Sequence, residues 1–366
     1  MPVSAIPVIL HYTGGYNDGG GIVSVVRALA AAGRFECVLG VNPDFQQRRA
    51  PVLAALELPP MPGEQIGLRA FWRGLAVADA VQAWLHADER RVFHGHSRAG
   101  LVVALWLHSR GEARVVASVH CYGRQRWFYR WAARRLRERL FWLSPTMKHY
   151  YGVDRGGSWT QCMPGCVRLP AVESVPRERT AEGIVRIGGA GALVAWKGWH
   201  LVLEALVLLP ETVRTKLRFV HIGGADGSAE SARYAATLHD RAAALNLDTM
   251  VEWRGPQPSS EVLLAEIDAL IVASACEPFS VAMLEALAAG VPVLAADSGG
   301  SCDIIDPTKN GWLFRSGDAG DLARMLAGLV ESGALAAARP SPQPNWRFEA
   351  GRIADEWAEI YRRVRS

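Results

Sequence analysis

Short apolar segments alternate with predicted helices along this chain of 366 residues. Five apolar segments in the first half are predicted strands, with helices between them: 8–12, 37–41, 92–94, 115–119 and 139–143. Strands that alternate with helices form parallel sheets, so this half is predicted to be an α/β domain. A second alternation, from residue 184 to about residue 333, predicts another α/β domain.

Proline and charged residues separate the two predicted domains. A connector is indicated by Pro164, Gly165, Pro170, Pro176 and the charged run 173–182. A proline-rich break at Pro340, Pro342 and Pro344 precedes a last helix. We therefore expect a first domain at 1–168, a linker at 169–182, a second domain at 183–340 and a C-terminal helix at 346–366.

The most informative segment follows the apolar strand predicted at 269–274. Glu277 comes just after that strand, and Pro278 disfavours helical angles at its predecessor, so Glu277 is expected in the loop. Ser280 is the expected cap of a helix that begins at Val281. The backbone amides of Phe279, Ser280 and Val281 are then expected to face the same crevice as Glu277, and a helix N-terminus in such a crevice favours an anion such as a phosphate.

Glu285 is the only polar side chain between Val281 and Ala289 in this apolar helix. An ionised carboxylate in such surroundings needs a partner. The adjacent hydroxyls of a ribose can both bind one carboxylate, whereas a neighbouring Arg or backbone amides would give Glu285 a purely structural role. The second carboxylate, Glu277, favours the ligand-binding interpretation.

The spacing of Glu277 and Glu285 resembles the Glu-x7-Glu signature of the family-4 retaining glycosyltransferases, which have the GT-B fold. Other segments are similar to elements of that family in the same order: 196–198, 220–224, 251–255, 296–300, 304–305, 310–314 and 346–363. The resemblance covers nearly the whole chain and is more specific in the second half. It implies two facing Rossmann-like domains with parallel sheets, and a C-terminal helix that crosses back onto the N-terminal domain.

The activity implied by this resemblance is that of a retaining hexosyltransferase. The donor would be a nucleoside diphosphate sugar, and the acceptor a saccharide, a lipid-linked saccharide or a small molecule, as in the synthesis of cell-surface polysaccharides or glycoconjugates. Glu277 would hold the sugar hydroxyls, Glu285 the ribose, and Lys197 the diphosphate. The family usually has an Arg five residues before that Lys, where this chain has Ala192. Either another Arg, such as Arg254 or one of the first domain, supplies the charge, or the leaving group is stabilised less.

In the first domain, a glycine-rich segment at 14–21 follows the first strand. Its spacing is not that of a dinucleotide-binding fingerprint, but Gly20 and Gly21 resemble the family's first loop, which approaches donor and acceptor. His120 ends another predicted strand and is similar to the family's His that faces the transferred sugar. His96 fits the family's His-x-His turn. Each of these positions also has a purely structural interpretation. The glycines could form a flexible loop tip, and each His could be a packed residue of the domain interior.

Two other classes of protein remain open. The segment 95–99 is similar to the nucleophile elbow of α/β-hydrolases, which would make Ser97 the nucleophile of a serine esterase, with His200, His221 or His239 as its base. That interpretation explains neither Glu285 nor Lys197. A GT-B sugar-nucleotide epimerase or a binding-only relative is the third possibility, because Ala192 leaves the charge pattern incomplete.

The composition of the chain limits which kinds of partner, cellular location and cofactor we expect. Hydrophobic residues make up 50% of the chain and charged residues 21%, which is typical of a globular protein, and a net charge of +4 indicates no nucleic-acid partner. No apolar run approaches the roughly 18 residues that span a bilayer. The first ten residues read as a strand and not as a signal peptide, and the six scattered cysteines suit reduced thiols, so we expect a cytoplasmic protein. No Asp-x-Asp motif occurs, and we expect neither a metal nor a cofactor.

The segment 124–143 carries seven Arg residues among aromatic residues. Phe128, Ala132, Leu136 and Leu140 recur at helical spacing. A basic helix with aromatic residues can lie on an anionic membrane surface, which would suit a lipid-linked acceptor and a location at the inner face of the membrane. An ordinary Arg-rich helix exposed to water is the structural alternative.

Overall fold

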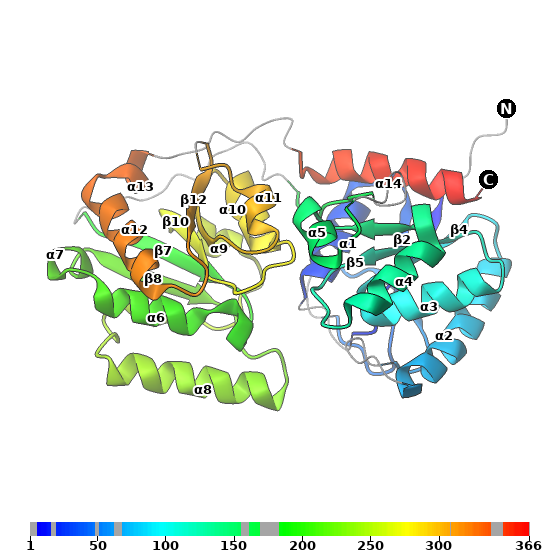
Figure 1. Cartoon of the computed structure of the whole chain (residues 1–366), viewed down its shortest axis with the longest axis horizontal. Coiled ribbons are helices and arrows are strands. Elements are labelled where there is room, and N and C mark those ends of the chain that lie inside the picture. The colour runs from blue at the N-terminus through cyan, green and yellow to red at the C-terminus, as the bar shows by residue number, and fades with distance from the viewer. Residues whose placement is uncertain are drawn as a thin grey trace. The chain divides into compact units, whose positions relative to one another are not determined.

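The computed structural model describes residues 6–15, 20–47, 51–61, 68–154, 161–168, 183–307, 309–337 and 347–365. The chain divides into two compact units, Met1–Arg168 with Arg347–Ser366, and Leu169–Trp346. Each unit contains one six-stranded sheet with helices packed on it (Figure 1). The predicted fold class, two Rossmann-like units with parallel sheets, is confirmed.

The sheet of the first unit has the strand order β3-β2-β1-β4-β5-β6, and every pair is parallel. Its strands are β1 (Val8–Tyr12), β2 (Glu36–Val41), β3 (Ala54–Glu57), β4 (Arg91–Gly95), β5 (Val115–Val119) and β6 (Leu140–Trp142). Residues in β1, β5 and β6 are buried throughout, as expected for strands covered on both faces.

The helices of the first unit are α1 (Gly21–Ala32), α2 (Leu68–His86), α3 (Ser97–Ser109), α4 (Arg126–Leu136), η1 (Arg137–Arg139), α5 (Pro145–Tyr151) and α14 (Ala350–Arg365). The last of these comes from the C-terminus and packs on α1 and β4, so the predicted return of the closing helix to the N-terminal domain is confirmed (Figure 1). Aromatic contacts hold it there, because Tyr361 lies edge-on to Phe35 and Trp357 packs against His94.

The sheet of the second unit has the order β12-β11-β10-β7-β8-β9 and is also parallel. Its strands are β7 (Val185–Ala190), β8 (Leu217–Ile222), β9 (Val251–Trp253), β10 (Ala269–Val272), β11 (Val293–Ala296) and β12 (Gly311–Phe314). Its helices are η3 (Ala195–Lys197), α6 (Trp199–Leu208), α7 (Glu211–Arg214), α8 (Ala229–Ala244), α9 (Glu261–Leu264), α10 (Val281–Ala288), α11 (Ser301–Ile304), α12 (Ala319–Glu331) and α13 (Ala334–Ala337).

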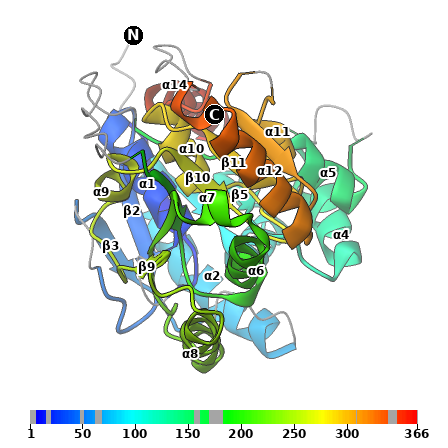
Figure 2. The same ribbon diagram turned by 90° about the vertical axis from the view of Figure 1, so that its left-hand side faces the viewer.

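Helices cover both faces of this second sheet. Figure 2 shows α6, α8 and α12 together on one face, where α6 contacts both of the others, and α10 on the opposite face. The core between α6, α12 and the strands is built around the buried side chains of Trp199 and Phe219. Both sheets therefore have the same arrangement, in which the first strand lies next to the fourth.

The strand order reverses at that pair of strands, β1 and β4 in the first unit and β7 and β10 in the second. In open α/β sheets, ligands bind beyond the carboxyl ends of the strands at such a reversal. Each unit thus has one place where its topology favours a binding site. The segments that follow these strands carry most of the predicted site residues, whereas His120 follows β5 and Arg254 follows β9.

The five strands predicted for the first half are confirmed, with shifts of at most one residue at their ends. Arg139 is the clearest shift, because it ends the short helix η1 and the strand β6 begins at Leu140. The strand β3 was not predicted; its four residues, Ala54–Glu57, lie at the sheet edge and are mostly exposed. A short edge strand needs no continuous apolar run.

Candidate active site

Glu277 and Lys197 form an ion pair at the reversal point of the second unit. The Lys197 Nζ atom lies 2.7 Å from Glu277 Oε2, and the two side chains are 17% and 4% exposed. Lys197 ends η3, which follows β7, and Glu277 lies in the loop after β10. The structure thus brings together two predicted site residues that are 80 positions apart.

Hydroxyl groups and backbone contacts fix this ion pair in place. Ser274 Oγ donates to Glu277 Oε2 at 2.8 Å, and Ser298 Oγ donates to the Ser274 carbonyl at 2.7 Å. The Ala275 N–H donates to the Trp196 carbonyl, which joins the two loops directly. Because the carboxylate and the loops are held by several bonds, the pair is a pre-organised charged group and not a mobile surface contact.

Two glycines let these loops approach closely. Gly198 has a φ of +73°, and a Cβ there would lie 2.1 Å from the Ala273 carbonyl oxygen. A Cβ on Gly300 would lie 2.3 Å from the Pro278 carbonyl oxygen, and the Gly300 N–H donates to the Glu277 carbonyl. Any side chain at either position would push the Lys197 loop or the Glu277 loop out of place.

The helix that follows Glu277 begins as predicted. Ser280 is the N-cap of α10, its side chain accepts a hydrogen bond from the Met283 N–H, and Val281 is the first helical residue. The first N–H groups of a helix lack partners within it, and together they favour a negative charge. Phe279 and Ser280 are buried and Val281 is half-buried. The helix N-terminus and Lys197 therefore both supply positive potential at this strand end.

Glu285 lies about one turn after the start of α10 and is half-buried, while the residues on either side of it, Leu284 and Ala286, are fully buried. A role in ribose binding stays a prediction.

Arg254 is placed differently from its predicted role. Its guanidinium bonds to both Glu252 and Glu266, with distances of 2.7 Å and 2.9 Å in the two ion pairs. These carboxylates hold the pKa of Arg254 above its usual value. Two carboxylates already neutralise this cation, which argues against Arg254 as the substitute for the cation missing at Ala192.

In the first unit, the glycine-rich segment is described in part, because residues 16–19 lie outside the described residues. Gly20 is the N-cap of α1 and Gly21 its first residue, and both are exposed. The Asn42 side chain fixes the start of the segment by donating to the Gly14 carbonyl at 2.8 Å. The loop therefore has a rigid base at β1 and an exposed helix start.

Ser97 has the backbone geometry of a nucleophile elbow but not its chemistry. It begins α3 directly after the β4 turn and has a φ of +64°. Its Oγ donates to the Thr13 carbonyl at 2.6 Å, and the histidines suggested as its base belong to the second unit. The serine esterase interpretation is therefore not supported.

His120 and His96 are hydrogen-bonded to each other. His96 Nδ1 lies 2.9 Å from His120 Nε2, and His96 Nε2 lies 2.9 Å from Nδ1 of His11. His96 is only 3% exposed, and both of its ring nitrogens bond to neighbouring histidines. A direct contact of His96 with substrate stays a prediction. His96 is more deeply buried than its partner His120, which is half-buried and follows β5.

Burial keeps these histidines neutral. It lowers the pKa of His11 to about 3 and that of His120 to about 4. Burial, together with the neighbouring histidines, also holds the pKa values of His94 and His96 well below the usual value. The reversal point of the first unit thus presents uncharged hydrogen-bonding groups at neutral pH.

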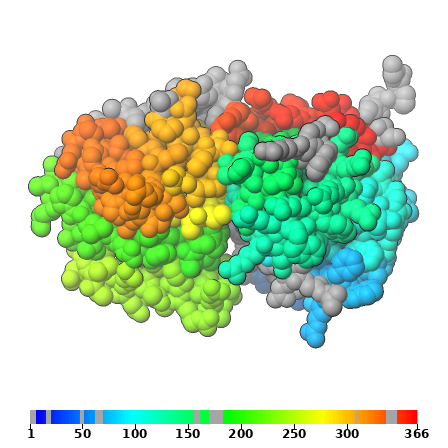
Figure 3. Space-filling model, in the orientation of Figure 1, coloured from blue at the N-terminus to red at the C-terminus, as the bar shows by residue number. Residues whose placement is uncertain are grey.

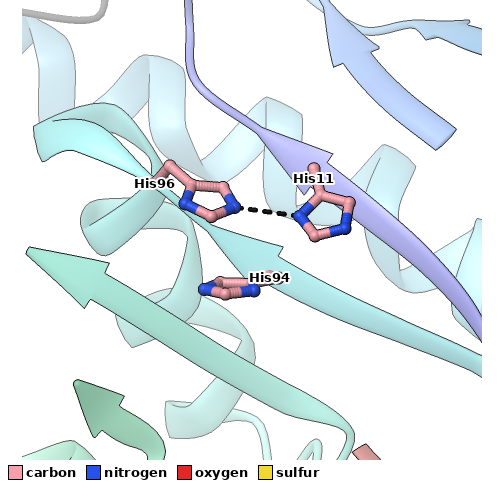
Figure 4. Close-up of side chains that lie close together, drawn as sticks. All are labelled: His11, His94 and His96. Carbon is pink, nitrogen blue, oxygen red and sulfur yellow. Dashed lines mark hydrogen bonds between the residues drawn. The ribbon is translucent and has the colours of Figure 1, made fainter. Parts of the chain in front are cut away.

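The spacing of His11, His94 and His96 would allow a metal, since one ring nitrogen from each lies within 4.8 Å of the others. However, His94 bonds to Tyr361 Oη at 2.7 Å and to Ser118 Oγ at 2.8 Å, so both of its nitrogens are occupied. Its ring also stacks on His96 with centroids 4.0 Å apart, and the two rings do not point at a common centre (Figure 4). We interpret the group as a hydrogen-bonded network.

Sequence analysis missed several residues of these sites, namely His11, Ser274 and Ser298. His11 lies inside an apolar strand, and the two serines end or follow apolar strands. Only their position in the fold could have identified these residues. Each is a polar residue near the carboxyl end of a strand that lies at a reversal point or is the next strand in the sheet.

Known proteins resemble this chain in sequence over its second half and in fold over nearly all of it. The profile of the family described as "Glycosyl transferases group 1" matches residues 178–340. The lipopolysaccharide core biosynthesis glycosyltransferase LpsE of Rhizobium meliloti is 28% identical over 171 residues, 47% of this chain and 46% of that protein. The D-inositol 3-phosphate glycosyltransferase of Corynebacterium urealyticum is 30% identical over 181 residues, 48% of this chain and 42% of that protein. The matches thus span less than half the length of these relatives.

Solved structures extend the likeness to the first unit. Anabaena HepE in complex with UDP and glucose superposes with a TM-score of 0.74 at 19% identity, over 96% of this chain and 98% of that one. Sucrose-phosphate synthase from Thermosynechococcus elongatus gives a TM-score of 0.78 at 18% identity, over 98% and 99%. At this identity the likeness concerns the fold, which is that of the GT-B glycosyltransferases. Residues 178–340 of this chain thus match the model of the family described as "Glycosyl transferases group 1".

Proposed function

We propose that this protein is a retaining hexosyltransferase that moves a sugar from a nucleoside diphosphate sugar to an acceptor hydroxyl. The observation that carries the proposal is the Lys197–Glu277 ion pair, held at the reversal point of the second sheet beside the N-terminus of α10. A cation, a helix N-terminus and a carboxylate at one strand end suit a ligand with a diphosphate next to sugar hydroxyls.

Each group has a role in donor binding. An ammonium group has three N–H donors, so Lys197 can keep its bond to Glu277 and still donate to a diphosphate oxygen. The N–H groups at the start of α10 add to that interaction, and Glu277 Oε1 accepts from a sugar hydroxyl. Glu285, on the same helix, accepts from the ribose. His120 of the first unit contacts the transferred sugar.

The chemistry follows from these charges. The acceptor oxygen bonds to the anomeric carbon, the bond from that carbon to the diphosphate oxygen breaks, and the acceptor's proton leaves with the nucleoside diphosphate. Negative charge grows on the departing diphosphate, where Lys197 and the α10 N-terminus stabilise it. Because these groups supply the positive charge, transfer should continue in the presence of a chelator.

The donor is tested by thermal unfolding with a panel of uridine, guanosine and adenosine diphosphate sugars. A donor at about 100 times its dissociation constant adds roughly 2.7 kcal/mol to the free energy of unfolding. Product analysis by NMR with the selected donor then gives the reaction and the anomeric configuration. Transfer with retention supports the proposal. An isomerised donor without transfer would indicate an epimerase, and no shift with any donor would contradict the proposal.

The acceptor class is proposed from the relatives. The name of LpsE assigns that protein to lipopolysaccharide core biosynthesis, and we extend the role to this chain as the synthesis of a cell-surface polysaccharide or glycoconjugate. In the described part of the chain, none of the helices is both long and apolar enough to cross a membrane. A lipid-linked acceptor would then be reached from the membrane surface, at its cytoplasmic face.

The helix α4 is the surface that we propose for this contact. Phe128, Ala132 and Leu136 are buried against the first unit, while Trp127 is 68% and Trp131 39% exposed. The segment lies on the face of the first unit shown in Figure 3. Exposed tryptophans on a basic helix suit the interface of an anionic bilayer.

Vesicle co-sedimentation tests this contact. Trp127→Ser combined with Arg134→Gln should weaken binding to anionic vesicles at low salt, and Arg233→Gln, an exposed Arg on α8, is the matched control. Arg130 is unsuitable because its side chain bonds to the Tyr151 carbonyl at 2.6 Å. Equal sedimentation of the double variant and the control would remove the membrane proposal and leave the transferase proposal intact.

A further inference from the structure

Three histidines form a hydrogen-bonded series across the reversal point of the first unit. His11 lies in β1, His96 follows β4, and His120 follows β5. Figure 4 shows the first bond, from His11 to His96, and His96 bonds onward to His120. Both N–N distances are 2.9 Å, which is hydrogen-bond length.

A neutral imidazole has one N–H donor and one acceptor nitrogen. His96 uses both of its nitrogens in the series, so the two bonds must run in the same direction along the chain of rings. Either His11 donates to His96 and His96 donates to His120, or both bonds run the opposite way. The choice between these two patterns sets which nitrogen of His120 carries the proton.

The far end of the series decides between the patterns. His11 Nε2 is buried and has no hydrogen-bond partner within the described part of the chain. If the bonds run from His120 to His11, this nitrogen carries an N–H with no acceptor. If they run from His11 to His120, it carries only a lone pair. Buried N–H groups without partners are rarer in proteins than acceptors without partners, which favours the second pattern.

We propose that this series fixes His120 as the Nδ1–H tautomer, so that His120 presents an N–H donor to an oxygen atom of its ligand. His11 and His96 are then positioning residues, and neither touches the ligand. The Nδ1 atom of His120 has no hydrogen bond to any of the described residues, and the ring is half-buried, so the donor is available.

The proposal rests on the proposed function for the identity of the ligand, since the oxygen would be a hydroxyl of the transferred sugar. A neutral donor suits that task. A sugar hydroxyl is uncharged, and its lone pairs accept one N–H without the cost of burying an unpaired charge. The tautomer itself does not depend on the reaction.

The test is 15N NMR of the full chain with labelled histidine at pH 7, which distinguishes the two neutral tautomers. His11, His96 and His120 should all show a protonated Nδ1, with assignments from single His→Gln variants. A protonated Nε2 at His120 in the unmodified protein would overturn the proposal. This result holds whether or not sugar transfer is found, so a failed transfer assay would count against the proposed function alone.

His96→Leu and His94→Gln form a matched pair of variants. His96→Leu removes the neighbour of His120 and should give a mixture of both tautomers there. His94→Gln changes a ring in the same cluster that lies outside the series, so His120 should keep its protonated Nδ1. A His120 tautomer that is unchanged in His96→Leu would also overturn the proposal, because it would show that the series does not set it.

Discussion

The two reversal points have the same topology and opposite chemistry. Between β7 and β10 the second unit holds a charged pair, Lys197 and Glu277, supported by Ser274. Between β1 and β4 the first unit holds stacked histidines that burial keeps neutral. The topology favours a binding site at the same place in each sheet, and the side chains determine which chemical group suits each site.

The difference matches the two halves of a sugar nucleotide. A diphosphate needs positive charge, which the second unit supplies through Lys197 and the start of α10. A sugar ring binds uncharged hydrogen-bonding groups, and His120 of the first unit is the one that we propose for this contact. Substitutions of the charged pair in the second unit should therefore affect turnover and stability differently from disruption of the neutral histidine network in the first unit.

The largest effect is expected for the charged pair. Lys197→Met and Glu277→Gln should each lower the rate of sugar transfer about 10²–10³-fold, because each removes a group aimed at the charges of the donor. Glu252→Gln is the matched control, since Glu252 is also paired with a cation but is 58% exposed. Near-normal turnover of Glu277→Gln would contradict the site, provided that thermal unfolding shows a folded protein.

The loops of the second unit should be sensitive to a single methyl group. Gly198→Ala is expected to lower the free energy of unfolding by about 3 kcal/mol, through steric overlap with Ala273 and an unfavourable φ. Gly317→Ala, at a φ of +77° with open space around it, should cost only about 1 kcal/mol. Denaturant unfolding compares the two, and equal losses would show that the loops are not closely packed.

Lowering the pH should destabilise the first unit more than the second. The pKa of His11 is about 3 in the folded protein and near 6.5 in the unfolded chain, so between these values only the unfolded chain binds the proton. Stability therefore rises with pH in this window and falls on acidification, by about 2 kcal/mol at pH 5 for each such histidine.

The pKa values of His94 and His96 are shifted in the same direction, and His221, with a pKa of about 3, is the corresponding residue of the second unit. The first unit should consequently lose more protection than the second between pH 7 and pH 5. Hydrogen exchange measured on each unit tests this. Earlier opening of the second unit would contradict the comparison.

A smaller effect is expected at the ribose. Glu285→Gln should weaken binding of the nucleoside diphosphate about tenfold, which is about 1.4 kcal/mol, because it replaces charged hydrogen bonds by neutral ones. Glu261→Gln, an exposed Glu at the start of α9, is the control. Calorimetric titration measures both, and equal affinities would remove Glu285 from the site.

The smallest effect is expected at Gly20. Its φ of −90° is open to any residue and a Cβ there would meet no atom within 4 Å, so Gly20→Ala should lower the free energy of unfolding by only about 0.5 kcal/mol, because Ala is a poorer N-cap than Gly. If a ligand approaches this backbone, transfer should still fall a few-fold. An unchanged rate would indicate that the exposed start of α1 has no part in binding.

Much of the second unit could be predicted from local sequence. Pro278, Ser280 and the apolar strand before them determine the loop, the cap and the start of α10 without help from distant residues. The Lys197–Glu277 contact could not be predicted, because it depends on β7 lying next to β10. Sequence spacing carries no information on that pairing.

The first unit was harder to predict for a related reason. His11 and His96 are polar residues in an apolar setting, and only the order of β1, β4 and β5 reveals that their rings are in contact. Sequence spacing also does not show that Arg254, a candidate substitute for the Arg missing at Ala192, pairs with Glu266 12 residues further along the chain. Long-range packing, which sequence patterns do not encode, accounts for both.

The most direct test of the account is a crystal structure with a bound nucleoside diphosphate. We predict a diphosphate oxygen within about 3 Å of Lys197 Nζ and the ribose hydroxyls at the Glu285 carboxylate. A nucleotide bound elsewhere, with Lys197 still bonded to Glu277 alone, would contradict the proposed site and the activity derived from it.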